Sequence, residues 1–408
     1  MEKITFFNVY KFELPLKKEL VVKKHRLNKR EGLLISIGIS NGLCGFGEIS
    51  PLPFFHNESI DDARLQIKNL KNNKMFLKNI EGLFEQQDLS DFFSDSIKAV
   101  KKDSEDGPPG SAFLKIFTGF LNKLNDLFND SKVFPSVRTG LEMALTSLIF
   151  IRPGLEKIFK SAPYSDLQVC RLMMDLKKDP EKEILEIIKN GYSAIKIKVG
   201  RSPVEQEISS INKIKKLILQ NQLNTISLRL DANSLWSLQE AVYFGKAIGS
   251  SLIEYMEDPL SNMSEYGQFF KETHIPVALD EKLPKLTDLI KIKGLNGKCP
   301  DYLKAIIIKP DFAGGFFKTT GLIDFALSNG IKPVLSNSFN SSLLISYIAL
   351  FAGIMHLNET PLGIDSLSLF SENLLLEDIK IIGGKINILE ILDNIKKINS
   401  NLLSPAGF

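Results

Sequence analysis

Short apolar runs alternate with amphipathic stretches from about residue 167 onward. The runs have strand length, and stretches between them such as EKEILEIIKN and SLQEAVYFGKAIG carry apolar residues at helical spacing. Regular alternation of strand and helix predicts parallel strands in an α/β fold, here a (β/α) barrel. The predicted strands are 167–174, 194–199, 226–231, 252–257, 276–280, 303–308, 332–336 and 362–365.

The N-terminal part has a different pattern. Residues 4–14 and 33–40 alternate or run apolar as strands do, and the segment between them, KKELVVKKHRLNKREG, is basic and polar. We expect residues 19–30 to form an exposed loop that closes over a bound ligand. Ser59 and Asp62 are spaced as the cap of the first helix.

Three units follow from these patterns: a small α+β domain at residues 1–132, a barrel domain at 133–365 and a tail at 366–408. Helical spacing dominates an insertion at about 70–130, broken by the linker DSEDGPPGS at 103–111. We favour peripheral helices over a binding role for this insertion. In the tail, DIKIIGGKINI predicts a hairpin that returns to the small domain.

Composition favours a small-molecule partner. The 408 residues include 51 basic and 48 acidic side chains, for a net charge of +3, which gives no electrostatic argument for nucleic acid or an anionic membrane. The longest nearly apolar run, 343–355, is shorter than the ~20 residues that span a bilayer, and predicts a buried barrel helix. With no secretory pattern at the N-terminus and three scattered cysteines, we expect a cytoplasmic protein. The oligomeric state stays open.

Five predicted strands carry an acidic or basic residue at or next to their carboxyl ends. They lie within AIKIKVG, SLRLDAN, LIEYMEDP, PVALDEK and AIIIKP, and each follows the one before after about 30 residues, the length of one βα unit. In a (β/α) barrel the carboxyl ends of the strands converge on one site. The five residues are Lys198, Asp231, Glu257, Asp280 and Lys309.

The residue types indicate metal-assisted acid–base chemistry. Three carboxylates are hard oxygen ligands, typical of Mg²⁺ or Mn²⁺, while the four histidines are too scattered for a zinc-like set. Lys196 shares a strand face with Lys198, and two neighbouring ammonium groups disfavour each other's charge, so one lysine can be a neutral base. The alternative is a lysine pair that only bridges carboxylates. The favoured reaction is proton abstraction next to a carboxylate.

These motifs resemble the enolase superfamily, in its lysine–lysine branch of muconate-lactonizing-enzyme-like proteins, and within it the family of o-succinylbenzoate synthases. The resemblance spans the chain except for about 70–130. It is carried by GFGEISPLPFF, PSVRTGLEMAL, KIKVG, RLDAN, EDP, LDEK, IIIKP and GIDS. It implies a (β/α)7β TIM-like barrel with an N-terminal α+β capping domain that the C-terminal tail completes.

The resemblance also implies roles and a reaction. Lys198 would be the base and then the acid, Lys309 a cation that stabilises an enediolate, and Lys196 a residue that tunes its neighbour. The activity implied is dehydration of 2-succinyl-6-hydroxy-2,4-cyclohexadiene-1-carboxylate to 2-succinylbenzoate in menaquinone biosynthesis. Asp231, Glu257 and Asp280 match the metal ligands. The substrate-binding positions implied are Asn233, Gly314, Gly315 and Ser336.

Some residues depart from the family pattern. Residues 336–344 read SNSFNSSLL where SSSxESSxG is usual, so Asn337, Asn340 and Leu344 replace Ser, Glu and Gly. Asn340 counts against a muconate cycloisomerase that would use the glutamate as a proton donor. N-acylamino acid racemases and dipeptide epimerases are further enzyme alternatives, and a non-catalytic binding protein on the same scaffold is the alternative from another class.

Overall fold

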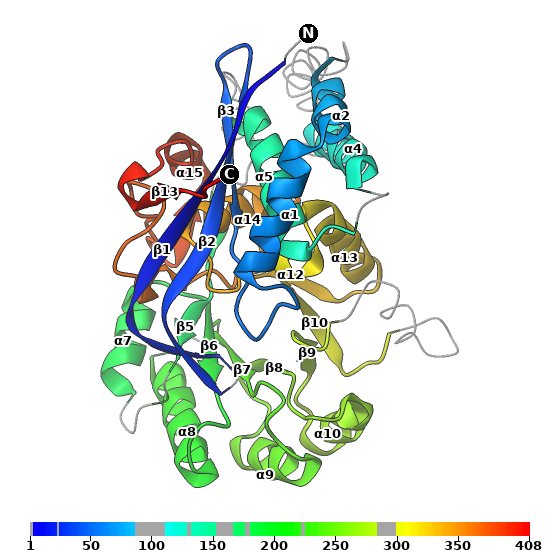
Figure 1. Ribbon diagram of the computed structural model, residues 1–408. Helices are drawn as coiled ribbons and strands as arrows, with labels where there is room; N and C mark the ends of the chain where they lie inside the picture. Colours follow the sequence, from blue (N-terminus) through cyan, green and yellow to red (C-terminus); the bar gives the residue numbers. More distant parts are fainter. Residues whose placement is uncertain are drawn as a thin grey trace.

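The computed structural model describes residues 3–22, 24–85, 111–128, 132–151, 166–174, 176, 180–221, 225–283 and 299–408. Figure 1 shows a barrel of strands and helices with an antiparallel sheet and further helices against one side of it. Of the predicted linker at 103–111, residues 103–110 lie outside the described residues and Ser111 begins a helix. Among the described helices, none is long and apolar enough to span a membrane.

An antiparallel sheet with the strand order β13-β1-β2-β3 forms the N-terminal domain. Its strands are β1 (Ile4–Val22), β2 (His25–Ile39), β3 (Cys44–Ile49) and the C-terminal β13 (Leu403–Pro405). The helices are α1 (Ile60–Asn72), α2 (Lys74–Glu85), α4 (Ser111–Phe128) and α5 (Pro135–Phe150). Ser59 and Asp62 form the predicted capping box of α1.

The predicted loop at 19–30 is wrong, because these residues form the distal part of the β1–β2 hairpin. Leu20 pairs with Leu27, and Val22 pairs with His25. Leu20 and Val22 are buried beside Leu52, whereas Val21 between them is exposed. The period of two that defines a half-buried strand is therefore present, and the surrounding lysines obscured it.

The barrel sheet contains seven parallel strands in the order β11-β10-β9-β8-β7-β6-β5. They are β5 (Arg171–Met173), β6 (Ala194–Lys198), β7 (Ser227–Asp231), β8 (Ile253–Glu257), β9 (Val277–Leu279), β10 (Leu303–Ile308) and β11 (Lys332–Leu335). Helices on the outside include α7 (Glu181–Lys189), α8 (Val204–Gln220), α9 (Leu238–Ile248), α10 (Tyr266–Thr273), α13 (Phe316–Ser328) and α14 (Ser342–Ile354). A short α12 (Pro310–Ala313) follows β10.

The predicted eighth strand, 362–365, is reduced to two backbone bridges that close the barrel. Leu362 N donates to Gln168 O and its carbonyl accepts from Cys170 N, while Gly363 N donates to Leu335 O. We call residues 361–363 the seam. From inside the barrel, Arg229 Nη1 donates to Pro361 O over 2.7 Å and so braces the seam against β7.

The tail differs in part from its predicted form. Ile382 and Lys385 exchange two backbone hydrogen bonds across the predicted Gly383–Gly384 turn, but the strand after it, β12 (Lys385–Asn387), pairs with β4 (Asp166–Gln168) and not with the N-terminal sheet. The short strand β13 is the part that pairs with β1. The predicted domain boundaries stay predictions.

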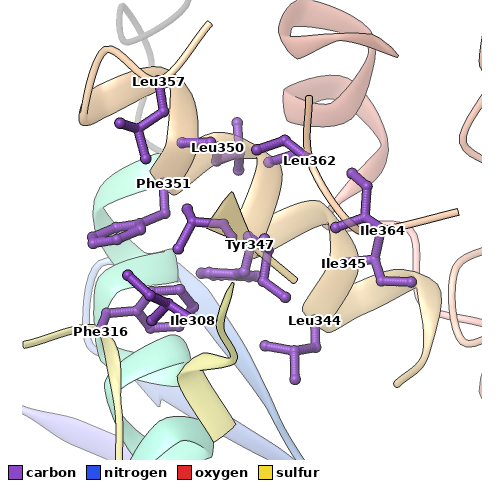
Figure 2. Packing of buried hydrophobic residues seen from close by; sticks show 14 of the residues in the cluster. Ile308, Phe316, Leu344, Ile345, Tyr347, Leu350, Phe351, Leu357, Leu362 and Ile364 are labelled. Atoms are coloured by element: carbon purple, nitrogen blue, oxygen red, sulfur yellow. The ribbon is translucent and has the colours of Figure 1, made fainter. Parts of the chain in front are cut away.

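Helix α14, predicted from the apolar run at 343–355, lies in the barrel core. Every residue of α14 is buried. Figure 2 shows Tyr347 and Phe351 directed towards Phe316 on α13, and the rings of Phe316 and Phe351 lie 5.0 Å apart. Phe117 of α4 also packs on Phe351, which places this predicted peripheral helix against the barrel.

Candidate active site

The groups predicted to be catalytic meet at the carboxyl ends of the barrel strands. Ile195 and Ile197 are fully buried on one face of β6, so the alternate residues of that strand share the other face. β7 and β8 each end at one of the predicted acids, and the last acid and base directly follow β9 and β10. The residues at these positions are Lys196, Lys198, Asp231, Glu257, Asp280 and Lys309.

Asp231, Glu257 and Asp280 form a buried acidic group, and each offers a carboxylate oxygen within 4.8 Å of the others. Burial raises the pKa of Glu257 to about 8 although Lys196 lowers it. Burial raises the pKa of the neighbouring Asp258 to about 7, and the negative charge of Asp280 contributes to this rise. Burial disfavours the Asp231 carboxylate, but Lys196 and Lys198 outweigh burial and hold its pKa below the usual value. Oxygen donors at this spacing fit a divalent cation such as Mg²⁺ or Mn²⁺.

Lys198 lies between Asp231 and Asn233. Its Nζ donates to Asp231 Oδ2 over 2.6 Å and to Asn233 Oδ1 over 3.0 Å. Burial lowers the pKa of Lys198; the Asp231 carboxylate opposes this shift and the Lys196 ammonium adds to it. A lowered pKa leaves more of the amine neutral near neutral pH, as a general base requires.

Lys196 has the opposite shift. Its Nζ lies 2.8 Å from Asp231 Oδ2 and also contacts Glu257 Oε2. Burial disfavours the ammonium, but the charges of Asp231 and Glu257 outweigh burial and raise the pKa of Lys196 well above its usual value. The two lysines of β6 are therefore suited to different roles, one as a base and one as a fixed cation.

Removing the Lys196 charge should shift the pH dependence of turnover. The cation helps to lower the pKa of Lys198, so Lys196→Met should raise that pKa and leave less neutral base at a given pH. The acidic limb of the kcat/KM profile, which rises as the base loses its proton, should move to higher pH by about one unit. An acidic limb that stays in place or moves to lower pH in Lys196→Met would contradict this prediction.

Lys309 lies four strands away from Lys198 in the order of the sheet. Its Nζ is 2.7 Å from Asp280 Oδ1 and 4.8 Å from the centre of the Phe55 ring. Burial disfavours the charge, but Asp280 outweighs burial and raises the pKa of Lys309. A persistent cation between a carboxylate and an aromatic face suits charge stabilisation.

Four of these residues line a cavity of about 620 Å³ between the barrel and the hairpin: Lys196, Lys198, Asp280 and Lys309. Asn233 and Ser336, two of the predicted substrate-binding residues, line this cavity. Gly314 and Gly315 are not among the described residues that line it, and the N–H groups of both donate to Pro310 O. The structure therefore does not bring these two glycines to the cavity with the other predicted residues.

The apolar walls of the cavity were not predicted from the sequence. They come from the hairpin, from the loop after β3 and from the barrel, and they include Val22, Leu52, Phe55, Leu172, Met174 and Leu235. A signal for one wall was present in GFGEISPLPFF, but nothing in a single sequence shows which of its apolar residues turn to the site.

Comparison with known proteins defines the class. The family model described as enolase C-terminal domain-like matches residues 180–390, and the model of the MenC N-terminal domain matches residues 4–83. The chain belongs to the enolase superfamily. Within it, the chain is similar to the curated o-succinylbenzoate synthase of Vibrio cholerae, at 27% identity over 90% of each chain. It is also similar to that of Aliivibrio fischeri, at 28% identity over 90% of this chain and 91% of the other.

A plant protein and several solved structures are similar as well. Protein PHYLLO, chloroplastic, of Arabidopsis thaliana is 29% identical over 80% of this chain, and the match spans 18% of that protein. MenC from Desulfotalea psychrophila superposes with a TM-score of 0.70 at 19% identity, over 94% of this chain and 99% of the other. The L-Ala-D/L-Glu epimerase of Bacillus subtilis superposes with a TM-score of 0.66 at 19% identity, over 94% of this chain and 96% of the other. These structures confirm the predicted barrel with its capping domain.

Proposed function

We propose that the protein is an o-succinylbenzoate synthase, which dehydrates 2-succinyl-6-hydroxy-2,4-cyclohexadiene-1-carboxylate to 2-succinylbenzoate in menaquinone biosynthesis. The observation that carries the proposal is the site itself, in which Lys198 and Lys309 project from strands four places apart towards one buried group of three carboxylates. The similarity to curated synthases over 90% of the chain supports this reaction over others of the superfamily.

In the proposed reaction Lys198 acts twice. Its neutral amine takes the proton from C1, the carbon that bears the carboxylate, and the electron pair of the C–H bond passes into an enediolate. When the pair returns to form the new ring double bond, the C6–O bond breaks and the leaving hydroxide takes the proton from Lys198 as water. One amine on one face is sufficient for both transfers.

The remaining groups stabilise charge. The Lys309 ammonium, held by Asp280, offsets negative charge on the enediolate, and Lys196 stays protonated beside Asp231. Asp231, Glu257 and Asp280 would hold Mg²⁺ or Mn²⁺, which when bound supplies Lewis-acid stabilisation worth several kcal/mol. A cavity of about 620 Å³ can hold a small-molecule carboxylate as substrate. The cytoplasmic location stays a prediction.

Conversion of the cyclohexadiene to 2-succinylbenzoate by the purified protein, followed by absorbance, tests the function directly. Turnover should require Mg²⁺ or Mn²⁺, stop with EDTA and return when the metal is restored. If the protein exchanges the α-proton of an N-acylamino acid in deuterated water but forms no 2-succinylbenzoate, the racemase alternative is correct. Metal binding without either reaction would indicate a non-catalytic binding protein.

The hairpin should become less accessible when product is bound. Val21, Val22 and Lys24 near its tip line the cavity, and His25 stacks on Phe54 at a ring distance of 3.6 Å. A ligand that contacts these residues should slow trypsin cleavage after Lys24 several-fold, because cleavage requires local opening. Mass spectrometry of digests with and without 2-succinylbenzoate measures this, and equal cleavage rates would contradict a lid role for the hairpin.

A further inference from the structure

A buried polar cluster joins the capping domain to the barrel beside Lys309. Its members come from the loop after β3, from α12 and from the loop after β11, and all are buried. We call this cluster the cap clamp. It consists of Ser50, His56, Asp311, Ser338 and Asn340.

Asn340 is the central member of the cap clamp. Its Nδ2 donates to Ser50 Oγ over 3.0 Å and to Asp311 Oδ2 over 3.1 Å, and its Oδ1 accepts from Ser338 N over 2.7 Å. Its exposed fraction is 1%, and it is not among the described residues that line the cavity. Both amide protons are used to connect a residue of the cap with a residue of the barrel.

Asp311 and His56 extend this connection along the loop. Leu52 N donates to His56 Nδ1 over 2.9 Å, so Nδ1 is unprotonated and a neutral ring carries its proton on Nε2. That nitrogen donates to Asp311 O over 3.2 Å and lies 3.7 Å from Asp311 Oδ2. The loop is thus fixed to α12, which begins directly after Lys309.

The loop in turn places an aromatic ring on the catalytic cation. Phe55 precedes His56, and its ring centre lies 4.8 Å from Lys309 Nζ. The rings of Phe55 and His56 both pack on Phe312 of α12, at 5.0 Å and 5.6 Å. Any movement of residues 52–56 away from α12 would therefore move Phe55 off the Lys309 ammonium.

We propose that Asn340 is a positioning residue, which acts through Ser50 and Asp311 to hold residues 52–56 so that Phe55 lies over Lys309. The cap clamp itself is independent of the reaction, and only its effect on turnover rests on the proposed function. An amide is required at this position, because a carboxylate there would lie about 3.1 Å from the Asp311 carboxylate with both side chains buried.

Arg30 limits how far the loop can move. Its guanidinium donates to Ser50 O, Pro51 O and Phe339 O, over 2.7, 3.1 and 3.0 Å. The start of the loop is therefore held without Asn340. Loss of the Asn340 amide leaves the His56 contact with Asp311 O in place, so residues 52–56 should become more mobile while the loop stays attached and the protein stays folded.

Hydrogen–deuterium exchange tests the cap clamp without any assay of activity. Asn340→Ala should raise exchange several-fold in peptides covering residues 52–56, whose amides of Leu52, Phe55 and His56 are hydrogen-bonded within the loop. The matched control is Asn394→Ala, which removes another buried amide, one that donates to Glu377 O in the tail. Unchanged exchange at 52–56 in Asn340→Ala, or an equal rise in the control, would overturn the proposal.

A double-mutant cycle in kcat tests positioning. Asn340→Ala and Phe55→Leu should each lower kcat by about tenfold to a hundredfold, and the double variant should be no slower than Phe55→Leu, because both changes remove the same contact. Losses that multiply would overturn the role of Phe55. If the wild-type protein has no synthase activity, the exchange result still decides the cap clamp, so failure of the proposed function is distinguishable.

Exchange of the amide and the carboxylate between positions 340 and 311 tests whether kcat can be rescued. Asn340→Asp should be at least as impaired in kcat as Asn340→Ala, since it places two buried carboxylates side by side. Asp311→Asn in that background returns one carboxylate and one amide to the pair, and should recover most of the loss. Wild-type kcat in Asn340→Asp, or no recovery in the double variant, would overturn the requirement for an amide.

Discussion

Lys198→Arg should abolish synthase turnover, whereas Lys309→Arg should retain part of it. Arginine keeps its proton at neutral pH and cannot serve as a base, so Lys198→Arg should lose about 10⁴-fold in kcat, the upper range for a positioned acid–base group. At position 309 the side chain acts by its charge. A guanidinium can still pair with Asp280 and stack on Phe55, so the loss there should be about 10²-fold or less.

Steady-state kinetics with the cyclohexadiene substrate measures both losses. The matched control is Lys246→Arg, an exposed lysine that pairs with Glu272 over 2.7 Å on the outer helices, and it should leave kcat unchanged. Equal, complete loss in the two active-site variants would indicate that both lysines exchange protons, as in a racemase, and the assignment of unequal roles would be wrong.

Asp231→Ala should remove both metal binding and activity. Asp231 contributes an oxygen to the acidic group and also accepts from Lys196 and Lys198. Its loss deletes a ligand. It also leaves two buried ammonium groups without their shared carboxylate, and these positive charges repel a metal cation. Affinity for Mg²⁺ should fall at least about 10²-fold, and turnover should become undetectable.

Isothermal titration calorimetry with Mn²⁺ or Mg²⁺ measures the affinity. Glu254→Gln is the matched control, because Glu254 lies on β8 with Glu257 but pairs with Arg229 and Lys332 instead. This control should bind the metal with wild-type affinity even if it unfolds at a lower temperature. Undiminished metal affinity in Asp231→Ala would refute the ligand assignment.

The barrel was predictable because its signals are periodic and local. Runs such as AIKIKVG and AIIIKP combine a buried strand with one polar end, and the βα repeat brings those ends together whatever the intervening helices contain. Asp231, Glu257 and Asp280 could therefore be named as one group before any coordinates. Their roles as metal ligands are predictions, which the metal titration of Asp231→Ala tests.

The parts that were wrong or missed depend on contacts between distant segments. The hairpin at 19–30 is stabilised by burial of Leu20 and Val22 against Leu52, and the surrounding lysines obscure the period of two that these residues follow. The substrate-binding role of Gly314 and Gly315, which rests on resemblance, stays a prediction, and the N–H groups of both donate to Pro310 O. The contact of Phe55 with Lys309 joins residues from two domains, and a single sequence carries no signal for it.

The seam gives the barrel a preferred place to open. On most of its circumference the sheet is held by ladders between strands, whereas at residues 361–363 the two edges are joined by a few backbone hydrogen bonds, by the Arg229 brace and by the side chains of Ser336 and Asn337, which donate to Gly363 O. Local opening should cost least free energy where the fewest hydrogen bonds must break, so amide exchange at Leu362 and Gly363 should be faster than in β7 and β8. Because Cys170 on one side of the seam and Ser336 on the other both line the cavity, opening of the seam would also displace two parts of the cavity wall.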